Sequence, residues 1–390
     1  MPDLSENDLA DLRTALREAL QRSSDEGSVR ATMSGTTGID TDLWQVLVVD
    51  FALPSLAVPE QWGGAGAGWA AQRVMFEELG RFLACVPALS TIGLALPALV
   101  ASGDDFAKSV MVPSILVGER LVTAALLGAD PVSTCTVIVS GTDSSPTLAG
   151  TVAHVLDGDT ADEILLLGRD SHDDIGLYLI DTAAGGVARE HFATSDLTRR
   201  VTSLTLDAAP ARRLGARDAG PRIVAEVRPQ ALLSLACEQS GGAAAALDQS
   251  VAYAGQRAQF GRLIGSFQAV KHRLAEVLVA VEGCRSATWT TANALDAGDL
   301  DAGLLSEACA AVCSEAYVKA ASGNVQVHGG IGYTWEHPAH LHVKRSRGSA
   351  ALLGTPAEHR AAIADLLPLL DQSKTKTQQT RSRVEEGALR

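Results

Sequence analysis

The spacing of apolar residues predicts helices at both ends of the chain and short strands between them. In residues 1–122 leucines recur at helical spacing, and Ser5 is a plausible N-cap for the first helix, which we expect over 4–20. Residues 123–215 hold short β-rich runs separated by turn-like groups such as GTDSSP and DGDT. Helical periodicity returns in 216–370. The pattern therefore predicts an α+β protein whose regions follow each other as all-α, all-β, all-α.

The three regions are expected to be separate domains that share an extensive core, because 390 residues exceed one typical domain. The middle region is predicted to be a small antiparallel β-domain. In the last region we expect a long helix over 227–255, with Pro229 in its first turn. Residues 371–390 are polar and contain TKTQQTRSR, which predicts a mobile tail or a segment that orders on a partner.

One uncharged stretch, residues 82–103, is long enough to raise the question of a membrane span. Pro87 and Pro97, with Ser90 and Thr91 between them, favour a buried and broken helical segment instead. The N-terminus lacks the basic and then apolar layout of a signal peptide. We therefore expect a cytoplasmic protein without a membrane span.

Composition narrows the function classes. Hydrophobic residues make up 46% and charged residues 20%, as in a soluble globular enzyme. The net charge of -14 is opposite to what a free-standing nucleic-acid binder needs. The six cysteines form no Cys-x-x-Cys pair and lie mostly in apolar helical stretches, which predicts buried free thiols and no metal site.

The segment YAGQRAQFGRLIGSFQ carries the first candidate binding residues. We expect one helix to end at Gly261 and the next to begin shortly afterwards, with Arg257, Phe260 and Gln268 around the junction. Such a junction leaves backbone groups and a cation free to meet an anionic ligand. The alternative is an ordinary helix corner with a surface arginine.

Two further segments contain paired glycines. QVHGGIGYTWEHP follows a predicted helix over 304–322, so Gly329 and Gly330 fall past a helix end, where backbone can approach a phosphate closely or simply cap the helix. Near the N-terminus, PEQWGGAGAG is a Gly-rich turn that leads into a helix closing with EELGR.

Together these segments resemble the acyl-CoA dehydrogenase family over nearly the whole chain. The matching patterns are PE-x-x-GG-x-G followed by EELGR, a weaker G-x-V-x-x-V-x-(D/N)G-x-x-AD at residues 150–162, R-x-QFG-x-x-I-x-x-FQ, and Q-x-x-GG-x-GY-x-x-E-x-P. The resemblance implies a helical N-terminal domain, a β-domain and a C-terminal four-helix bundle. It also implies FAD between the β-domain and the bundle, with part of each site supplied by a neighbouring subunit.

In the resembled family a glutamate removes the α-proton of an acyl-CoA thioester while hydride leaves the β-carbon for flavin N5. Leu353 stands at the usual position of this glutamate, before Gly-Thr, and Ala231 stands at the family's alternative position. Neither side chain accepts a proton. Glu238, Glu336 and Glu358 lie near in sequence and are weaker candidates for the base.

The flavin-facing strings of the β-domain are also altered. The family's T-E-P-x-x-GSD is reduced to Leu127-Gly128-Ala129-Asp130, and its W-(I/V)-(T/S)-N-G to His154-Val155-Leu156-Asp157-Gly158. Hydroxyl groups that would bind the isoalloxazine ring are missing from both.

The residues that in the family hold the ADP half of FAD across the subunit interface are present. By resemblance, Arg257 pairs with the pyrophosphate, the adenosine path is lined by Phe260, Gly261 and Gln268, the pyrophosphate is also contacted by Gln326, Gly329 and Gly330, and Thr355 contacts the flavin. Helix-end packing is the alternative role for each.

A chain that keeps these ADP-binding residues but lacks the base resembles one subunit of actinobacterial heteromeric acyl-CoA dehydrogenases, the subunit without the base. Several of these enzymes act on CoA esters of steroid side chains. The implied partners are an acyl-CoA substrate, a homologous Glu-bearing subunit in an α2β2 assembly, and electron-transfer flavoprotein or a similar acceptor. Because the overall charge is negative, local basic residues must attract the anionic CoA ester. Two alternatives stay open: a homo-oligomeric flavoenzyme with an unidentified base, and a flavin-free structural or regulatory homologue.

Overall fold

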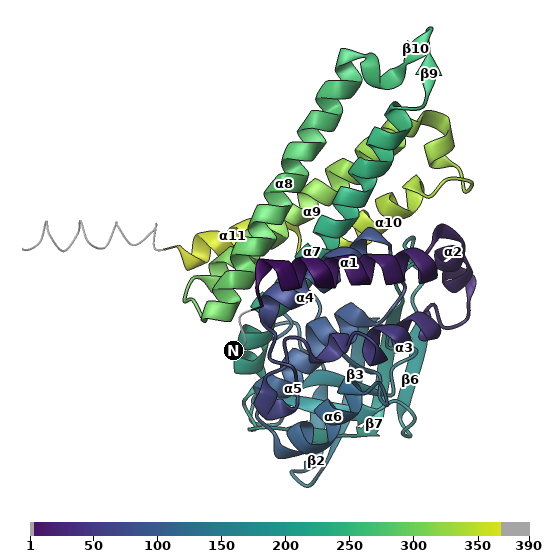
Figure 1. Cartoon of the computed structure of the whole chain (residues 1–390). Helices are drawn as coiled ribbons and strands as arrows, with labels where there is room; N and C mark the ends of the chain where they lie inside the picture. The colour runs from purple at the N-terminus through teal and green to yellow at the C-terminus, as the bar shows by residue number, and fades with distance from the viewer. Residues whose placement is uncertain (1–3, 368–390) are drawn as a thin grey trace, which may run out of the picture.

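The N-terminal region is helical, as predicted. The computed structural model describes residues 4–367, and the predicted tail at 371–390 lies outside them (Figure 1). The α-helices of this region are α1 (Glu6–Ser23), α2 (Glu26–Ser34), α3 (Thr41–Val49), α4 (Gly68–Arg81), α5 (Leu96–Ser102) and α6 (Val112–Leu116). They are joined by the short 3-10 turns η1 (Leu53–Ser55) and η2 (Glu60–Trp62) and by the π-helical segments η3 (Leu89–Ala95) and η4 (Ala107–Met111).

Local signals explain where two of these elements begin and break. The Ser5 hydroxyl accepts a hydrogen bond from Asp8 N, and the Asp8 carboxylate accepts one from Ser5 N, so the predicted N-cap is part of a full capping box. In the uncharged stretch 82–103, residues 82–87 form turns and irregular chain, and the π-helical η3 then runs without a gap into α5; η3 and most of α5 are buried. Within residues 4–367 no helix has the length and apolarity needed to cross a membrane.

The middle region is a mixed sheet of eight strands with the order β6-β7-β3-β2-β4-β5-β8 and β1 paired to β4. The strands are β1 (Val122–Ala124), β2 (Ile138–Thr142), β3 (Ser145–Leu156), β4 (Glu163–Arg169), β5 (Ile175–Asp181), β6 (Val187–His191), β7 (Val201–Pro210) and β8 (Arg212–Leu214). The expectation of a purely antiparallel sheet was wrong, since both β1 and β2 pair with β4 in parallel. The chain leaves the sheet after β1 and re-enters in the same direction, so both strands run along β4.

The sheet is buried on both faces along strand β4. Leu165 and Leu167 join the main hydrophobic cluster under the helices, while Ile164 and Leu166 join a second cluster on the opposite face. Because both sides of the strand are covered, its sequence is continuously apolar instead of alternating.

The C-terminal region contains the long helices α7 (Gly220–Ala254), α8 (Gln268–Ala297) and α9 (Ala302–His328), and the shorter α10 (Ala339–Ser349) and α11 (Pro356–Leu366). Helix α7 begins earlier than predicted, so Pro229 lies inside it and not in its first turn. The buried packing of α7 outweighs the local preference of proline. The expected helix end at Gly261 was also wrong, because α7 ends at Ala254 and a separate hairpin follows.

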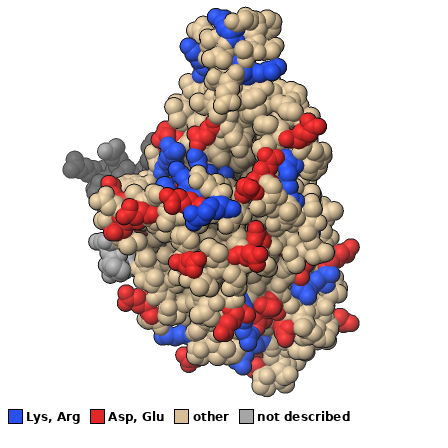
Figure 2. All heavy atoms as spheres, turned by 45° about the vertical axis from the view of Figure 1, so that its right-hand side comes forward, with Lys and Arg blue, Asp and Glu red and all other residues tan. Residues whose placement is uncertain are grey.

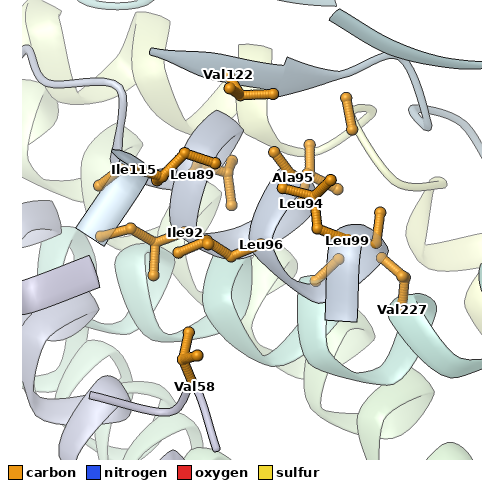
Figure 3. Packing of buried hydrophobic residues seen from close by; sticks show 14 of the residues in the cluster. Val58, Leu89, Ile92, Leu94, Ala95, Leu96, Leu99, Ile115, Val122 and Val227 are labelled. Carbon is orange, nitrogen blue, oxygen red and sulfur yellow. The ribbon is translucent and has the colours of Figure 1, made fainter. Parts of the chain in front are cut away.

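One main hydrophobic cluster connects all three regions. Figure 3 shows Leu89 to Leu96 of η3 and α5 packed between Val122 of β1 and Val227 of α7. The helical segment with the two prolines is thus the layer between the sheet and the C-terminal helices.

Helices α4 and α7 cross in direct backbone contact. A Cβ atom added at Gly80 would overlap the carbonyl oxygen of Glu238, and one added at Gly241 would overlap that of Glu77. Only glycine permits this approach. The crossing buries Glu77, Glu78 and Glu238, each of which is paired with arginines.

We predict that Gly241→Ala lowers the unfolding free energy by about 1 to 3 kcal/mol or more, because the two backbones must separate. Gly283→Ala in α8 is the matched control, since a Cβ there meets no atom within 4 Å; it should stabilise the chain by about 0.5 to 1 kcal/mol. Thermal and denaturant unfolding of both variants test this. Equal melting temperatures for the two variants would contradict the close contact.

Candidate functional site

The segment around Arg257 is a projecting β-hairpin. Strands β9 (Ala258–Gln259) and β10 (Arg262–Leu263) pair with each other, and the amide of Ile264 donates to the carbonyl of Arg257 over 2.8 Å. Phe260 and Gly261 form the turn with φ of 53° and 75°. Phe260 is 92% exposed, and Figure 1 shows the hairpin standing beyond the body of the molecule at the end of α7 and α8.

The side chain of Arg257 is exposed and makes no hydrogen bond or ion pair within residues 4–367. Arg262, by contrast, lies over the ring of Phe267 at 4.0 Å. Figure 2 shows basic and no acidic side chains at the tip on the face that it draws. The hairpin therefore offers a free guanidinium to an anion that another molecule carries.

The second glycine segment lies at the same end of the bundle. Helix α9 ends at His328, whose ring is 4.2 Å from that of Tyr253 in the last turn of α7. Gln326 is exposed, and Gly329 and Gly330 have nothing within 4 Å of an added Cβ. The backbone at these glycines is open to a close ligand, as the resemblance requires.

Gln268 and Thr355 complete the set of expected cofactor residues. Gln268 is the first residue of α8 and is exposed beside the hairpin. Thr355 lies away from the hairpin, at the start of α11, where its hydroxyl forms a capping box with Glu358. The seven expected residues from Arg257 to Gly330 thus share one end of the helical bundle, and the role of Thr355 as a flavin contact stays a prediction.

Both positions of the family's base lie in the main hydrophobic cluster. Leu353 is 3% exposed and Ala231 is 1% exposed. The loop that carries Leu353 is fixed by Arg228, which donates to the carbonyl oxygen of Leu353 over 3.2 Å and to that of Gly128 over 3.4 Å. Apolar side chains therefore occupy the places where the resemblance puts a carboxylate.

Arg228 belongs to a buried charged network that sequence reasoning missed. Its Nε donates to Glu307 over 2.6 Å, and His359 Nδ1 lies 2.6 Å from the other carboxylate oxygen. Burial raises the pKa of Glu307, but the hydrogen bonds from His359 and Arg228 outweigh it and hold that pKa below its usual range. The three residues lie on α7, α9 and α11, and no sequence spacing connects them.

The three weaker candidates for the base have other roles or no enclosed environment. One guanidinium nitrogen of Arg199 donates to both carboxylate oxygens of Glu238, over 2.6 and 2.7 Å, and Arg345 lies 3.1 Å from the same carboxylate. Burial raises the pKa of Glu238, and the two arginines lower it further than burial raises it. Glu358 caps α11, and Glu336 is exposed. A carboxylate bound by two guanidiniums is a poor general base.

A cavity of about 330 Å³ lies where the resemblance places the isoalloxazine ring. It is lined by Leu127 and Gly128, by His154, and by Ala351 and Leu352, which directly precede Leu353. Its polar groups include Thr194, Asp196 and Arg199. The exposed hairpin and glycines fit the ADP half of FAD, whereas this lining offers few of the hydroxyls that the resemblance implies for the ring.

Asp157, in the altered β-domain string, is buried near Arg199 of this lining. Ser90 Oγ donates to its carboxylate over 2.6 Å, and burial raises the pKa of Asp157 to about 6 despite that hydrogen bond and the nearby Arg199. Between pH 3.8, its ordinary pKa, and about 6, the folded chain holds a proton that the unfolded chain has released. Stability is therefore lost as the pH rises through this window.

We predict that Asp157→Asn removes this loss, so its melting temperature exceeds that of the wild type by more at pH 7 than at pH 4. The expected difference at pH 7 is on the order of 2 to 3 kcal/mol. Asn also tolerates the φ of 51° at this position. Asp173→Asn is the control, since Asp173 has a φ of 70° but an exposed carboxylate. A pH-independent difference for Asp157→Asn would contradict the raised pKa.

Comparison with known proteins agrees with this geometry. The acyl-CoA dehydrogenase N-terminal domain model matches residues 7–119, and the acyl-CoA dehydrogenase C-terminal domain model matches residues 226–367. The acyl-CoA dehydrogenase IpdE2 of Mycolicibacterium smegmatis is 34% identical over 350 residues, which cover 89% of this chain and 94% of the relative. The chain belongs to the acyl-CoA dehydrogenase family, a class of FAD-dependent oxidoreductases.

Solved structures point in the same direction. The ChsE4-ChsE5 complex from Mycobacterium tuberculosis contains a chain that is 28% identical, with a TM-score of 0.84 and coverage of 94% of this chain and 98% of that one. A variant of the Tcur3481-Tcur3483 steroid acyl-CoA dehydrogenase is 29% identical with a TM-score of 0.82, covering 92% of this chain and 97% of that one. The predicted fold of three regions is therefore confirmed.

Proposed function

We propose that this chain is the subunit without a catalytic base in a hetero-oligomeric, FAD-dependent acyl-CoA dehydrogenase. Its contribution is the hairpin and the glycine segment, which hold the ADP half of the FAD bound by a Glu-bearing partner. One observation carries the proposal: Arg257 is exposed beside the projecting hairpin, with no ion pair of its side chain in residues 4–367, while Leu353 and Ala231 are buried in the core. The chain thus presents binding groups outward and apolar groups at the positions of the base.

The packing around Leu353 supports the absence of dehydrogenation by this chain itself. Leu126, Leu235 and Leu353 belong to the same buried cluster, and Arg228 fixes the loop behind them. A proton acceptor beside the α-carbon needs both a carboxylate and space for the thioester. Position 353 provides neither the carboxylate nor the space.

The substrate we propose is the CoA ester of a steroid side chain, with electrons passing to an electron-transfer flavoprotein or a similar acceptor. The support comes from similarity to a steroid acyl-CoA dehydrogenase and to the two-component ChsE4-ChsE5 complex. The partner subunit is a homologue that carries the glutamate, in an α2β2 assembly.

A second candidate is a homo-oligomeric flavoenzyme with a different base. It is favoured by the His359–Glu307 pair, because a carboxylate on Nδ1 orients a histidine in the way that general bases often require. The His359 ring lies against Gly354, next to the family's base position. The flavin-free homologue has no comparable observation in its favour.

We predict that the purified chain alone oxidises acyl-CoA esters negligibly, about two to four orders of magnitude below its complex with a Glu-bearing homologue. The measurement is turnover with an artificial electron acceptor and the visible spectrum, for the chain alone and co-expressed. Substantial turnover by the chain alone that His359→Asn abolishes would favour the second candidate.

Arg257→Ala should strip FAD from the partner although the partner's sequence is unchanged. The substitution removes a charge-assisted contact to the pyrophosphate, a loss that commonly costs on the order of 2 to 5 kcal/mol at an interface. Flavin per complex and the melting temperature of the co-purified pair are measured for Arg257→Ala. Arg262→Ala is the control on the same hairpin, because Arg262 is already engaged by Phe267.

Equal flavin content in the wild type and Arg257→Ala, with the complex intact, would refute binding in trans. Arg257 would then be an ordinary surface cation beside the hairpin.

A further inference from the structure

A wide cavity of about 750 Å³ opens between helices α1, α4 and α8, where Figure 1 shows α1 lying across α4. It shares no lining residue with the cavity of about 330 Å³, and none with the residues expected to bind FAD. Its charged lining consists of four arginines and one glutamate, namely Arg13 and Arg17 of α1, Arg73 and Glu77 of α4, and Arg285 of α8.

Two buried carboxylates hold three of these arginines in fixed orientations. Arg13 donates to Glu77 over 2.5 Å and to Glu78 over 2.8 Å. Arg73 donates to the other oxygen of Glu77 over 2.8 Å, and Arg17 donates to both oxygens of Glu78 over 2.7 and 2.9 Å. The guanidinium groups are therefore in place before any ligand arrives, which lowers the entropy cost of binding.

The cavity has a surplus of positive charge. Arg13, Arg17 and Arg73 are paired with only two carboxylates, those of Glu77 and Glu78. The other acidic residues nearby have arginine partners of their own: Glu282 pairs with Arg285 over 2.5 Å, and Asp248 pairs with Arg81. Guanidinium groups stay charged at every pH at which proteins are folded. One unit of positive charge therefore remains here, on a chain whose net charge is -14.

Arg73 provides a second and independent sign of a ligand. Its side chain is 12% exposed, and its Nε is buried without a hydrogen-bond partner within residues 4–367. A buried donor without a partner is unfavourable. Because Arg73 lines the cavity, an oxygen atom bound there can accept this unused hydrogen bond.

We propose that this cavity binds a small oxyanion that carries two or more negative charges. The planar guanidinium groups of Arg13, Arg73 and Arg285 suit the oxygens of phosphate groups and of carboxylates equally, and these are the two sources of such a ligand. The volume of the cavity is that of a small-molecule site. The bound anion neutralises the surplus charge between α1, α4 and α8, and so it stabilises the folded chain.

The test is calorimetric titration of the purified full-length chain with inorganic pyrophosphate and with citrate, at constant ionic strength. Trp289, which lines the cavity and is 55% exposed, supplies a fluorescence signal in the same titration. At least one of the two anions should bind saturably and raise the melting temperature. Tighter binding of pyrophosphate assigns the site to a phosphate ligand, and tighter binding of citrate assigns it to a polycarboxylate.

Arg73→Met should weaken the binding on the order of tenfold or more, because it removes both the surplus charge and the unused donor. Glu77 keeps Arg13 as its partner in this variant. Arg285→Met changes an exposed residue and should also weaken the binding, so it decides the matter if Arg73→Met does not fold. Arg22→Met is the matched control, since Arg22 is exposed on α1 outside the cavity.

Three results would overturn the proposal. The first is the absence of saturable binding of both anions. The second is equal weakening by Arg22→Met and by the cavity variants, because the anions would then only screen the surface. The third is binding that Arg257→Ala abolishes and the cavity variants keep, because the anion would then lie at the hairpin. None of these results depends on whether the chain holds FAD in trans.

Discussion

The backbone contact between α4 and α7 is the constraint on which the rest of the structure depends. Gly80 and Gly241 allow the two helices to touch without intervening side chains. The same turns carry Glu77, Glu78 and Glu238, so the close approach moves three carboxylates out of water. A buried carboxylate is tolerated only when it is paired and hydrogen-bonded.

The partners of these carboxylates determine how the regions are joined. Arg17 reaches Glu78 from α1, which fixes the first helix across α4. Arg199, before strand β7, and Arg345 of α10 both reach Glu238. The crossing of α4 and α7 therefore connects the sheet and α10 to α7. The cavity of about 330 Å³, which Arg199 lines, lies at this junction. The pairing also withdraws Glu238 from proton transfer.

Much of the fold could be predicted because its signals, such as the capping box at Ser5 and Pro97 in the first turn of α5, act within a few residues. The hairpin was missed because a string with Phe260 at positive φ does not differ from a helix end by periodicity alone. The charged networks join residues far apart in the chain: Arg228, Glu307 and His359 meet only because α7, α9 and α11 pack together. The motifs of the candidate site could therefore be found in the sequence, whereas the residues that pack around them could not.

Packing within a single chain explains the apolar side chain at the base position, but it does not explain the exposed hairpin. Leucine at position 353 is what a closed core favours, because an empty apolar cavity there would destabilise the fold. The hairpin is different: Phe260 is almost fully exposed at its tip, and the side chain of Arg257 makes no hydrogen bond or ion pair within residues 4–367. An exposed aromatic ring beside an unpaired cation gains free energy only when another surface covers it. The interior of the chain is thus packed by itself, while the exposed hairpin is what the proposed assembly would cover.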